Sequence, residues 1–534
     1  MAGELGAMAA AALALAMVAG PAGADEARLS PAQVRQMRRE AAFRPRGLIA
    51  NNDGDDVFAQ VEQASPEALL AQRTIGMEAT QVSAIAYSTT RSFAGWTHDT
   101  RPCAPFLSTE GPFAHNMTAQ LIAQGTDPLR VIVDFCHQHG MEAFWSMRMN
   151  DTHDYKNEAM RPQWKLDHPH LLVGSAEQRP RFGAWTAVDY GQAQVRELAF
   201  QVIADVCRRY DVDGIELDFW RHPVLFRAHA QGGQATDENR EQMTALLRRV
   251  REAADEEAAR RGRPILLSAR VPDSLSWAAA IGLDLRTWIS EGLLDIVIPS
   301  GYVQFVPWEE TVRLCHAHGV AVYPCLSNPT LPDLPARALR ATIEAYRARA
   351  VNAWAAGADG LHIFNIFSPR HPVFRELGDP AGLVGRDKRY FVTFLGPRMA
   401  GAYLADGASH VTIPTLCPDA PQTVAPAGHY ETVIQVGEDI GVGGRLAPSV
   451  SLHLQFQELP PAADVAVTLN GQRLLAPDAD DTWLRYRVPP ELVRAGDNAL
   501  RVGCGADAAA PLVWRDAYLD VRYAPQATSA QGRG

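Results

Sequence analysis

Between residues 47 and 367, short apolar runs alternate with longer stretches in which apolar residues recur every three or four positions. A short apolar run bounded by turn residues is typical of a buried strand, and a period of about 3.6 residues is typical of an amphipathic helix. The apolar runs fall at residues 47–51, 83–88, 142–150, 213–219, 265–271, 295–302, 320–327 and 359–367. The pattern therefore predicts strands that alternate regularly with helices.

Eight strands alternating with helices over about 350 residues predict a (β/α)8 barrel, or TIM barrel, with insertions. A doubly wound open sheet is the alternative, but it usually brings a glycine-rich phosphate loop after an early strand, and the sequence has none. Two units resemble each other, VDFCHQHGMEAFW at 133–145 and VRLCHAHGVAVYP at 312–324. In both, a predicted helix ends at glycine and leads into the next strand.

The pattern changes after residues 387–394. Helical periodicity stops, and short alternating runs separated by Pro, Gly, Asp and Asn follow. Runs of this kind, spread over about 130 residues, predict an all-β sandwich, here with a jelly-roll-like appearance. We therefore expect a barrel domain at 25–395, a sandwich domain at 396–526 and a flexible tail at 527–534.

The N-terminus reads as a secretory signal in outline. An apolar stretch from Met8 to Gly20 precedes Ala22-Gly23-Ala24, small residues that suit a cleavage site before Asp25. The segment lacks the usual basic residues and carries Glu4, and an ordinary Ala-rich helix is the alternative. We expect residues 1–24 to be removed and the protein to be secreted or periplasmic. No later segment approaches the ~18 apolar residues of a membrane span.

Charge and cysteine content narrow the function further. The net charge of −11 argues against a nucleic-acid partner, because nucleic acid binding rewards clustered positive charge. Seven cysteines are too few for a disulfide framework, although Cys417 and Cys504 in the C-terminal region could pair. No CxxC or Cys/His spacing indicates a zinc site, so neither a metal nor a cofactor is expected.

The stretch YDVDGIELDFWRHP, residues 210–223, places two acids within a buried strand. Side chains alternate along a strand, so Glu216, Asp218 and Trp220 share one face. A buried, unpaired carboxylate costs several kcal/mol. In a barrel this face points inward, and Asp218 lies near the C-terminal mouth, where active sites of this fold are built. Glu216 lies one layer deeper.

Other predicted strands also end in polar residues. The structural alternative is that Arg148 and Arg270 only neutralise Glu216 and Asp218 in an ion network without a catalytic role. The polar residues at or just after the strand ends are Asn51, Asn52, Asp53, Arg148, Asn150, Asp151, His153, Asp154, Ser268, Arg270, Asp273, Ser300, Tyr302, Ser327, Asn328, His362 and Asn365.

Residues 188–223, VDYGQAQVRELAFQVIADVCRRYDVDGIELDFWRHP, resemble the signature of the glycosyl-hydrolase-like proteins similar to family 10. The resemblance is good over about 36 residues and weaker across the barrel. It implies a TIM barrel and action on a glycosidic bond, with Asp218 matching the acid at the strand end. Glu216 stands where that motif more usually has His. Family 18 chitinases are also similar here, but their catalytic Glu would fall at Trp220, so that assignment fails.

The expected activity is glycoside hydrolysis with a carbohydrate substrate. Such hydrolysis typically needs two carboxyl groups, so Asp218 is expected to act with Glu216, Asp273 or Asp151. Trp145 and Trp185 are further candidates for stacking under sugar rings. The side chains expected to bind sugar hydroxyls, sugar rings or an acidic substituent are Arg148, Asn150, Asp151, His153, Trp220, Arg221, Arg270, Tyr302 and Asn365.

Two alternatives remain open at this stage. The first is a barrel that binds carbohydrate without turnover. The second is a metal-dependent hydrolase that uses His153 with Asp151 and Asp154. The HxH patterns at 136–140 and 315–319 do not support the second, because they fall at helix ends away from the mouth.

Overall fold

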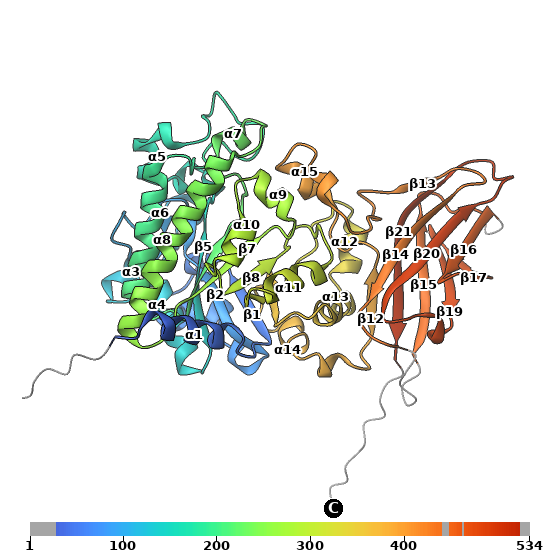
Figure 1. The fold of residues 1–534 in the computed structure, drawn as a ribbon, viewed down its shortest axis with the longest axis horizontal. Coiled ribbons are helices and arrows are strands. Elements are labelled where there is room, and N and C mark those ends of the chain that lie inside the picture. The colour runs from blue at the N-terminus through green and yellow to red at the C-terminus, as the bar shows by residue number, and fades with distance from the viewer. Residues whose placement is uncertain (1–27, 441–447, 462–463, 524–534) are drawn as a thin grey trace, which may run out of the picture.

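The computed structural model describes residues 28–440, 448–461 and 464–523, which form a barrel joined to a β-sandwich (Figure 1). The expected signal segment 1–24 and the expected tail 527–534 lie outside the described residues. Within the described part of the chain, no helix combines the length and apolar character that crossing a membrane would require.

The first part of the chain forms a parallel sheet. Its strands are β1 (Leu48–Asn52), β2 (Val82–Ser88), β5 (Glu142–Arg148), β6 (Gly214–Asp218), β7 (Leu266–Val271), β8 (Ile296–Pro299), β9 (Ala321–Val322), β10 (Cys325–Ser327) and β11 (Leu361–Phe364). They hydrogen-bond in the order β10-β11-β1-β2-β5-β6-β7-β8-β9.

The two ends of this sheet are consecutive in sequence. Only Tyr323 and Pro324 separate β9, which pairs with β8, from β10, which pairs with β11. Pro324 has no N–H to donate, so it interrupts what is otherwise one strand. The sheet therefore closes on itself at eight strand positions, and the predicted (β/α)8 barrel is confirmed.

Helices cover the outside of the barrel. The larger ones are α1 (Pro31–Ala42), α2 (Pro66–Arg73), α4 (Pro128–Gln138), α6 (Ala193–Arg209), α8 (Asp237–Arg261), α11 (Trp308–His316) and α13 (Ile343–Ala355). Just beyond β6, Phe219 packs against Trp288 of α10 (Leu285–Ser290), with ring centroids 5.3 Å apart. On the other face of β6, a Cβ at Gly214 would lie 2.3 Å from the ring of Phe144, so only glycine fits there. The alternation along β6 thus separates helix-facing from inward-facing residues, as predicted.

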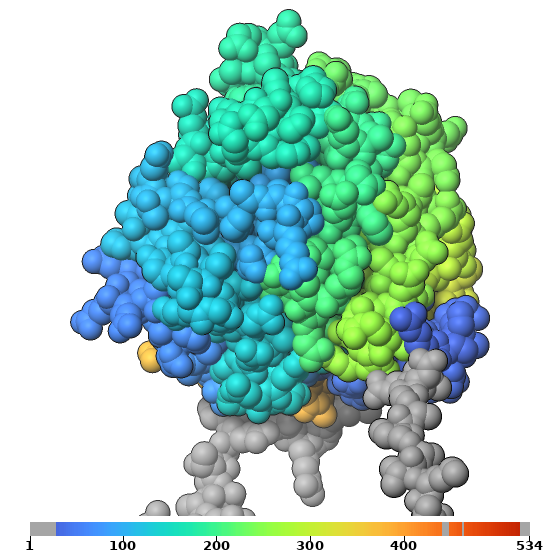
Figure 2. Space-filling model, turned by 90° about the vertical axis from the view of Figure 1, so that its left-hand side faces the viewer, coloured from blue at the N-terminus to red at the C-terminus, as the bar shows by residue number. Residues whose placement is uncertain are grey.

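Insertions follow the C-terminal ends of several strands. The hairpin of β3 (Thr90–Ser92) and β4 (Gly95–Trp96) comes after β2, and the long segment with α5 (Gln163–Asp167) comes after β5. The short α7 (Arg227–Ala230) follows β6. In Figure 1 α5 and α7 lie at the top, and in Figure 2 the teal segment after β5 projects at the top of the molecule. These insertions surround the C-terminal mouth of the barrel.

The opposite, N-terminal end carries a repeated clamp. Nε2 of His137 lies 2.9 Å from Asp213, and Nε2 of His316 lies 2.8 Å from Asp359. Each carboxylate also accepts a backbone N–H from the neighbouring strand, at 2.9 Å and 2.8 Å. The two histidines come from the paired CHxHG units. The two similar sequence segments therefore form the same structural arrangement at two places in the barrel.

The C-terminal part forms two antiparallel sheets, so the predicted β-sandwich is confirmed. In the first sheet, β12 (Lys388–Phe391), β21 (Leu512–Arg522), β15 (Ser449–Phe456), β19 (Trp483–Val488) and β18 (Asp478–Asp480) are neighbours in that order, and β13 (Gln422–Val424) pairs with β21. The second sheet contains β14 (His429–Val436), β20 (Gly496–Cys504), β16 (Val465–Leu469) and β17 (Gln472–Leu474). The buried alternate residues of the strands form a separate apolar core.

The chain passes between barrel and sandwich more than once. β12 pairs with β21, and afterwards α15 (Arg398–Ala402) returns to the barrel, where Trp277 donates to the carbonyl of Ala400. A fully buried ion pair joins Arg340 of α12 (Leu334–Arg340) to Asp516 of β21, 2.8 Å apart. Position 395 therefore lies between a sandwich strand and a barrel-bound helix.

The possible Cys417–Cys504 disulfide is not formed. All seven cysteines lie in the described ranges, and all are free thiols. Cys504 ends β20 in one sheet, whereas Cys417 precedes β13, which pairs into the other sheet. Their segments therefore belong to opposite layers of the sandwich.

Candidate functional site at the barrel mouth

Glu216, the deeper acid of β6, belongs to a buried ion pair. Its Oε2 lies 2.8 Å from Nε2 of His362, and its Oε1 accepts from Ser146 at 2.6 Å and from Asn51 at 3.3 Å. Burial alone would raise the pKa of Glu216, but the positive charge of His362 lowers it. Burial would lower the pKa of His362, whereas Glu216 raises it to about 9. This pair fills the barrel interior below the mouth.

Asp218 lies at the end of β6 and is 1% exposed. Its Oδ2 accepts from Nη2 of Arg270 at 2.7 Å, the contact expected from the sequence. Its Oδ1 accepts the backbone N–H groups of Trp220 and Arg221 at 3.0 and 2.9 Å. Arg270 is fully buried and stacks on Phe364 at 3.9 Å. Asp218 thus neutralises Arg270 and fixes the turn that carries Arg221.

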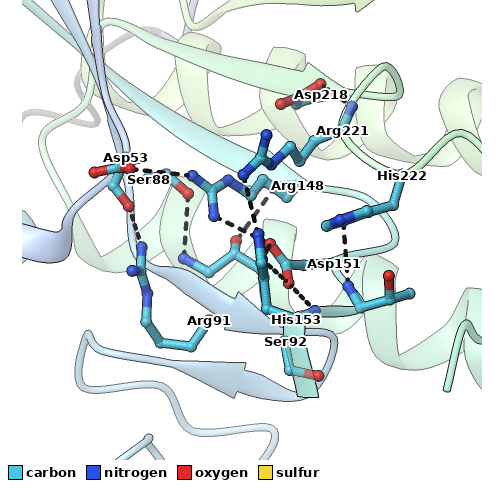
Figure 3. Close-up of polar contacts among 12 residues, drawn as sticks. Asp53, Ser88, Arg91, Ser92, Arg148, Asp151, His153, Asp218, Arg221 and His222 are labelled. Carbon is cyan, nitrogen blue, oxygen red and sulfur yellow. Dashed lines mark hydrogen bonds and ion pairs between the residues drawn. The ribbon is translucent and has the colours of Figure 1, made fainter. Parts of the chain in front are cut away.

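Arg148, at the end of β5, lies between two carboxylates (Figure 3). Its Nη1 donates to Asp151 at 3.0 Å, and its Nη2 lies 4.0 Å from Asp53. Asp53 also pairs with Arg73, and Arg91 binds Asp55. Burial would raise the pKa of Asp53, but the charges of Arg148, Arg91 and Arg73 hold it below its ordinary value. Asp53 therefore stays ionised beside the mouth.

A second chain of contacts leads from Asp151 towards the opposite wall of the mouth. Nδ1 of His153 lies 2.8 Å from Oδ1 of Asp151, and Nη2 of Arg221 lies 3.0 Å from Nε2 of His153. Nη1 of Arg221 donates to the hydroxyl of Tyr302. Because a guanidinium only donates, Nε2 of His153 accepts and its Nδ1 carries the proton towards Asp151. Burial opposes the charge of Asp151, yet His153 and Arg148 hold its pKa well below the ordinary value.

His222 completes this group of side chains. Its Nδ1 accepts the backbone N–H of Thr152 at 3.3 Å, so its Nε2 carries the proton, and its ring lies 4.7 Å from that of His153. Burial keeps the pKa of His222 well below its usual value. We call the set Asp53, Arg148, Asp151, His153, Arg221, His222 and Tyr302 the mouth cluster.

Non-glycine residues with left-handed backbone occur at three strand ends around the mouth. His222 follows β6 with φ 58°, Ser300 follows β8 with φ 70°, and Asn365 follows β11 with φ 60°. Each such residue costs of order 1–3 kcal/mol and persists only where the surroundings impose it. Strain of this kind clusters at functional sites.

Several residues expected to bind the ligand instead bond to or pack against other residues of the protein. The amide of Asn150 bonds only to the main chain of Val188 and Val224. Trp220 is 1% exposed and packs against Trp277 at 4.9 Å, so its ring presents no face to solvent. Asn365 differs: it is partly exposed, and its side chain makes no hydrogen bond with the described residues.

The two tryptophans named as further stacking candidates are also engaged. Trp145 is fully buried and donates to the hydroxyl of Thr89 at 2.8 Å. Trp185 lies beneath the guanidinium of Arg161, 4.7 Å from its ring centroid.

Asp273 is not brought to the mouth cluster. Its carboxylate accepts the backbone N–H of Phe305 and the hydroxyl of Ser300, both at 3.1 Å. It lines a separate crevice of about 570 Å³ beside α9 (Leu275–Ala280), α10 and α11. Burial raises its pKa to about 7. Asp273 therefore anchors the loop after β8, and its crevice shares no residue with the mouth cluster.

Asp151, His153 and His222 have ligand atoms within 4.8 Å of one another, the spacing of a metal site. However, the guanidinium of Arg221 already donates to His153, and that of Arg148 to Asp151. Two fixed positive charges at these atoms oppose a cation. Asp154, the third member expected for a metal centre, instead binds Lys165 at 3.1 Å and is fully buried.

One family model matches part of the chain. Residues 105–244 match the family model Glycosyl hydrolase-like 10. The matched segment contains β5, β6 and the long insertion between them, and so contributes Arg148, Asp151, His153, Arg221 and His222. No curated protein matches the chain.

Three of the solved structures that match the chain are as follows. Alpha-L-fucosidase isoenzyme 2 from Paenibacillus thiaminolyticus is 12% identical with a TM-score of 0.37, covering 64% of this chain and 48% of its own. The PgaB (BpsB) glycoside hydrolase domain from Bordetella bronchiseptica is 12% identical with a TM-score of 0.38. The match covers 62% of this chain and 97% of that domain. Chitinase ChiA74 from Bacillus thuringiensis is 9% identical with a TM-score of 0.37, covering 88% and 100%. This chain thus spans about half of the fucosidase chain.

Three side chains at the mouth were missing from the residues expected to act there. Asp53 directly follows β1, so its position after a strand was a usable signal. Arg91 lies in the short hairpin after β2, and this hairpin has no pattern of apolar residues from which it could be predicted. His222 enters the site because its backbone is left-handed, and the neighbouring sequence does not predict that conformation.

Proposed function

We propose that the protein hydrolyses glycosidic bonds at the C-terminal mouth of the barrel and is exported. One observation carries the proposal: the segment that matches Glycosyl hydrolase-like 10 supplies most of the mouth cluster. The location agrees with the rule that TIM-barrel enzymes act at the C-terminal ends of their strands.

Hydrolysis of a glycosidic bond needs one group that protonates the leaving oxygen and another that acts as base or nucleophile. We assign the protonation of the leaving oxygen to Nε2 of His153. Once the hydrogen bond from Arg221 is withdrawn, Nε2 takes up a proton from solvent, and Asp151, bonded to Nδ1, stabilises the resulting imidazolium. We assign the second function to Asp53, which stays ionised among three arginines and is 13% exposed. The two groups lie on either side of Arg148.

Asp218, the acid favoured by the sequence, takes a positioning role in this proposal. It is enclosed, and its oxygens hold Arg270 and the backbone of the turn that presents Arg221. Glu216 is assigned to the structural layer below the mouth with His362, and Asp273 to the loop after β8.

The test is a panel of oligosaccharides assayed for release of reducing ends. We expect His153→Gln and Asp53→Asn to lower kcat by roughly 10²–10⁴-fold, the usual contribution of a general acid or base. Because the side chain of His153 is 36% exposed, His153→Gln should change the melting temperature little. His139→Gln, the same change at an exposed residue at the end of α4, is the matched control.

Carbohydrate binding without turnover is the second candidate. It is favoured by the observation that Asp53, Asp151 and Asp218 are all ion-paired with arginine. Saturable glycan binding without release of reducing ends would support it over hydrolysis. A chelator is included in the assay, and loss of activity with it would show that the mouth binds a metal after all.

A further inference from the structure

Nearly all basic side chains around the mouth have a carboxylate partner, although Asp154 serves two of them. Within 4 Å, each of the following has a carboxylate partner in the described chain: Arg73 with Asp53, Arg91 with Asp55, Arg148 with Asp151, Arg161 and Lys165 with Asp154, and Arg270 with Asp218. Arg221 is the exception, because no carboxylate of the described residues lies within 4 Å of its guanidinium.

The side-chain contacts of Arg221 are with neutral groups. One nitrogen donates to the hydroxyl of Tyr302 and another to Nε2 of His153. Its Nε is buried and has no hydrogen-bond partner. A guanidinium that is partly withdrawn from water and lacks an acid is costly to keep. Each of the other basic residues named above has a carboxylate within 4 Å, so among them the guanidinium of Arg221 alone lacks such a partner.

Two further donors at strand ends of the mouth have no hydrogen-bond partner in the described residues. Nε2 of His222 carries a proton, because its Nδ1 accepts from the backbone, and the amide of Asn365 makes no hydrogen bond with the described residues. Both residues hold the left-handed conformation that places them at the mouth. A guanidinium with adjacent N–H donors is suited to a planar or tetrahedral oxyanion.

We propose that Arg221, with His222 and Asn365, binds an anionic group on the sugar substrate, a carboxylate or a sulfate. This rests on the proposed function and names the substrate class, acidic glycans. An anion that accepts the hydrogen bond from Nη2 of Arg221 in place of His153 leaves Nε2 of His153 free to take up a proton from solvent. Recognition of the acidic sugar is thereby coupled to freeing the group assigned to proton transfer.

The experiment measures binding, not turnover. The full chain is titrated calorimetrically with D-glucose, D-glucuronate and glucose 6-sulfate, which share a ring and differ in charge. We expect at least one of the two anionic sugars to bind roughly ten- to a hundredfold more tightly than glucose, as a charge-assisted hydrogen bond provides. The preference should weaken as salt is added. The carboxylate and the sulfate arms show which anion is recognised.

Variants decide whether Arg221 is responsible. Arg221→Gln should abolish the preference for the anionic sugar, and Arg221→Lys should keep part of it, because the charge remains but the fork is lost. Arg208→Gln removes the same charge from an exposed position near the end of α6 and should leave the preference intact. Thermal melts of each variant verify folding, and Arg221→Lys serves if Arg221→Gln does not fold.

The outcomes separate this inference from the proposed function. Equal affinity for charged and neutral sugars, absence of binding by either anion, or an unchanged preference in Arg221→Gln overturns the inference. Hydrolysis of neutral glycans alongside such a result leaves the proposed function standing. Anion preference that depends on Arg221, without hydrolysis of any glycan, supports the inference and removes the proposed function.

Discussion

The two ends of the barrel use ion pairs in different ways. At the N-terminal end, the pairs of His137 with Asp213 and of His316 with Asp359 repeat one arrangement, and each acid also receives a backbone N–H. At the C-terminal mouth no arrangement repeats and the network includes Arg221, whose side-chain contacts are with neutral groups. The repeated end fastens neighbouring strands, whereas the irregular end keeps a guanidinium without a carboxylate partner.

The difference teaches how to distinguish structural from functional charges in one fold. Both ends hold buried or half-buried ionic groups, so burial alone does not separate them. What separates them is whether the hydrogen-bonding and charge requirements of each group are met within the chain. Those of the clamps are met, and those of Arg221 and Asn365 are not.

The largest expected effect is on stability, from Asp218→Asn. Asp218 and Arg270 are 1% and 0% exposed, and neutralising the acid leaves a buried guanidinium without its counter-charge. We expect a loss of about 3–5 kcal/mol in unfolding free energy, measured by urea denaturation. The double variant with Arg270→Met should recover part of it. A loss similar to that of exposed Asp134→Asn would show that the pair is not structural.

The layer between the two ends should give the protein a pH dependence. The folded-state pKa of His362 is raised to about 9, so its stabilisation is complete below pH 6.5 and is lost as pH rises through about 9. The expected loss is roughly 3 kcal/mol, from 1.36 kcal/mol per pKa unit. Unfolding free energies of the wild type and His362→Gln across this range check it. An equal slope in both would assign the titration to another group.

The clamps at the N-terminal end should have smaller and independent effects. Asp213→Asn and Asp359→Asn each weaken one charge-assisted bond to histidine and one to the backbone, and Asp213→Asn also removes the ion pair with half-buried Arg263. We expect about 1–2 kcal/mol apiece, with the larger loss for Asp213→Asn. Because the clamps share no partner, the double variant should show the sum of the single losses in denaturant unfolding. A marked departure from additivity would mean that the two clamps are coupled.

The smallest effect concerns backbone strain at the mouth. Asn365→Gly relieves a left-handed residue at φ 60° and should stabilise the fold by about 0.5–1 kcal/mol, while weakening binding of the acidic sugar. Asn365→Ala keeps the strain without the amide and should be less stable than the glycine variant. Melting temperatures of the three proteins decide, and identical values would show that the conformation costs nothing.

Much of the fold was predictable because periodicity reports on burial. The apolar runs located all eight strand positions of the barrel, and alternation placed Glu216 and Asp218 on the inward face of β6. The hydrogen-bond and ion-pair partners of each acid were not predictable, because they come from side chains far away in the sequence. Alternation along β6 shows only which face Asp218 lies on. It does not show that Nη2 of Arg270 and the backbone N–H groups of the following turn donate to this carboxylate.

Local backbone turns account for the features of the mouth that the sequence did not predict. β7 ends at Val271, and after Pro272 the chain directs Asp273 to the backbone of residues 305–306. His222 reaches the mouth through a positive φ just before Pro223. Sequence periodicity describes strands and helices, and it carries no signal for single residues of this kind.

The route of the chain through β12 affects how the protein can be divided. A fragment ending at residue 395 would expose β12, whose hydrogen-bonding partner β21 lies at the far end of the chain. It would also lack the helix at 398–402, whose Ala400 carbonyl accepts from Trp277. An unpaired edge strand invites association with other copies. Expression of the barrel alone should therefore yield aggregates, and the two architectures should purify only as one continuous polypeptide.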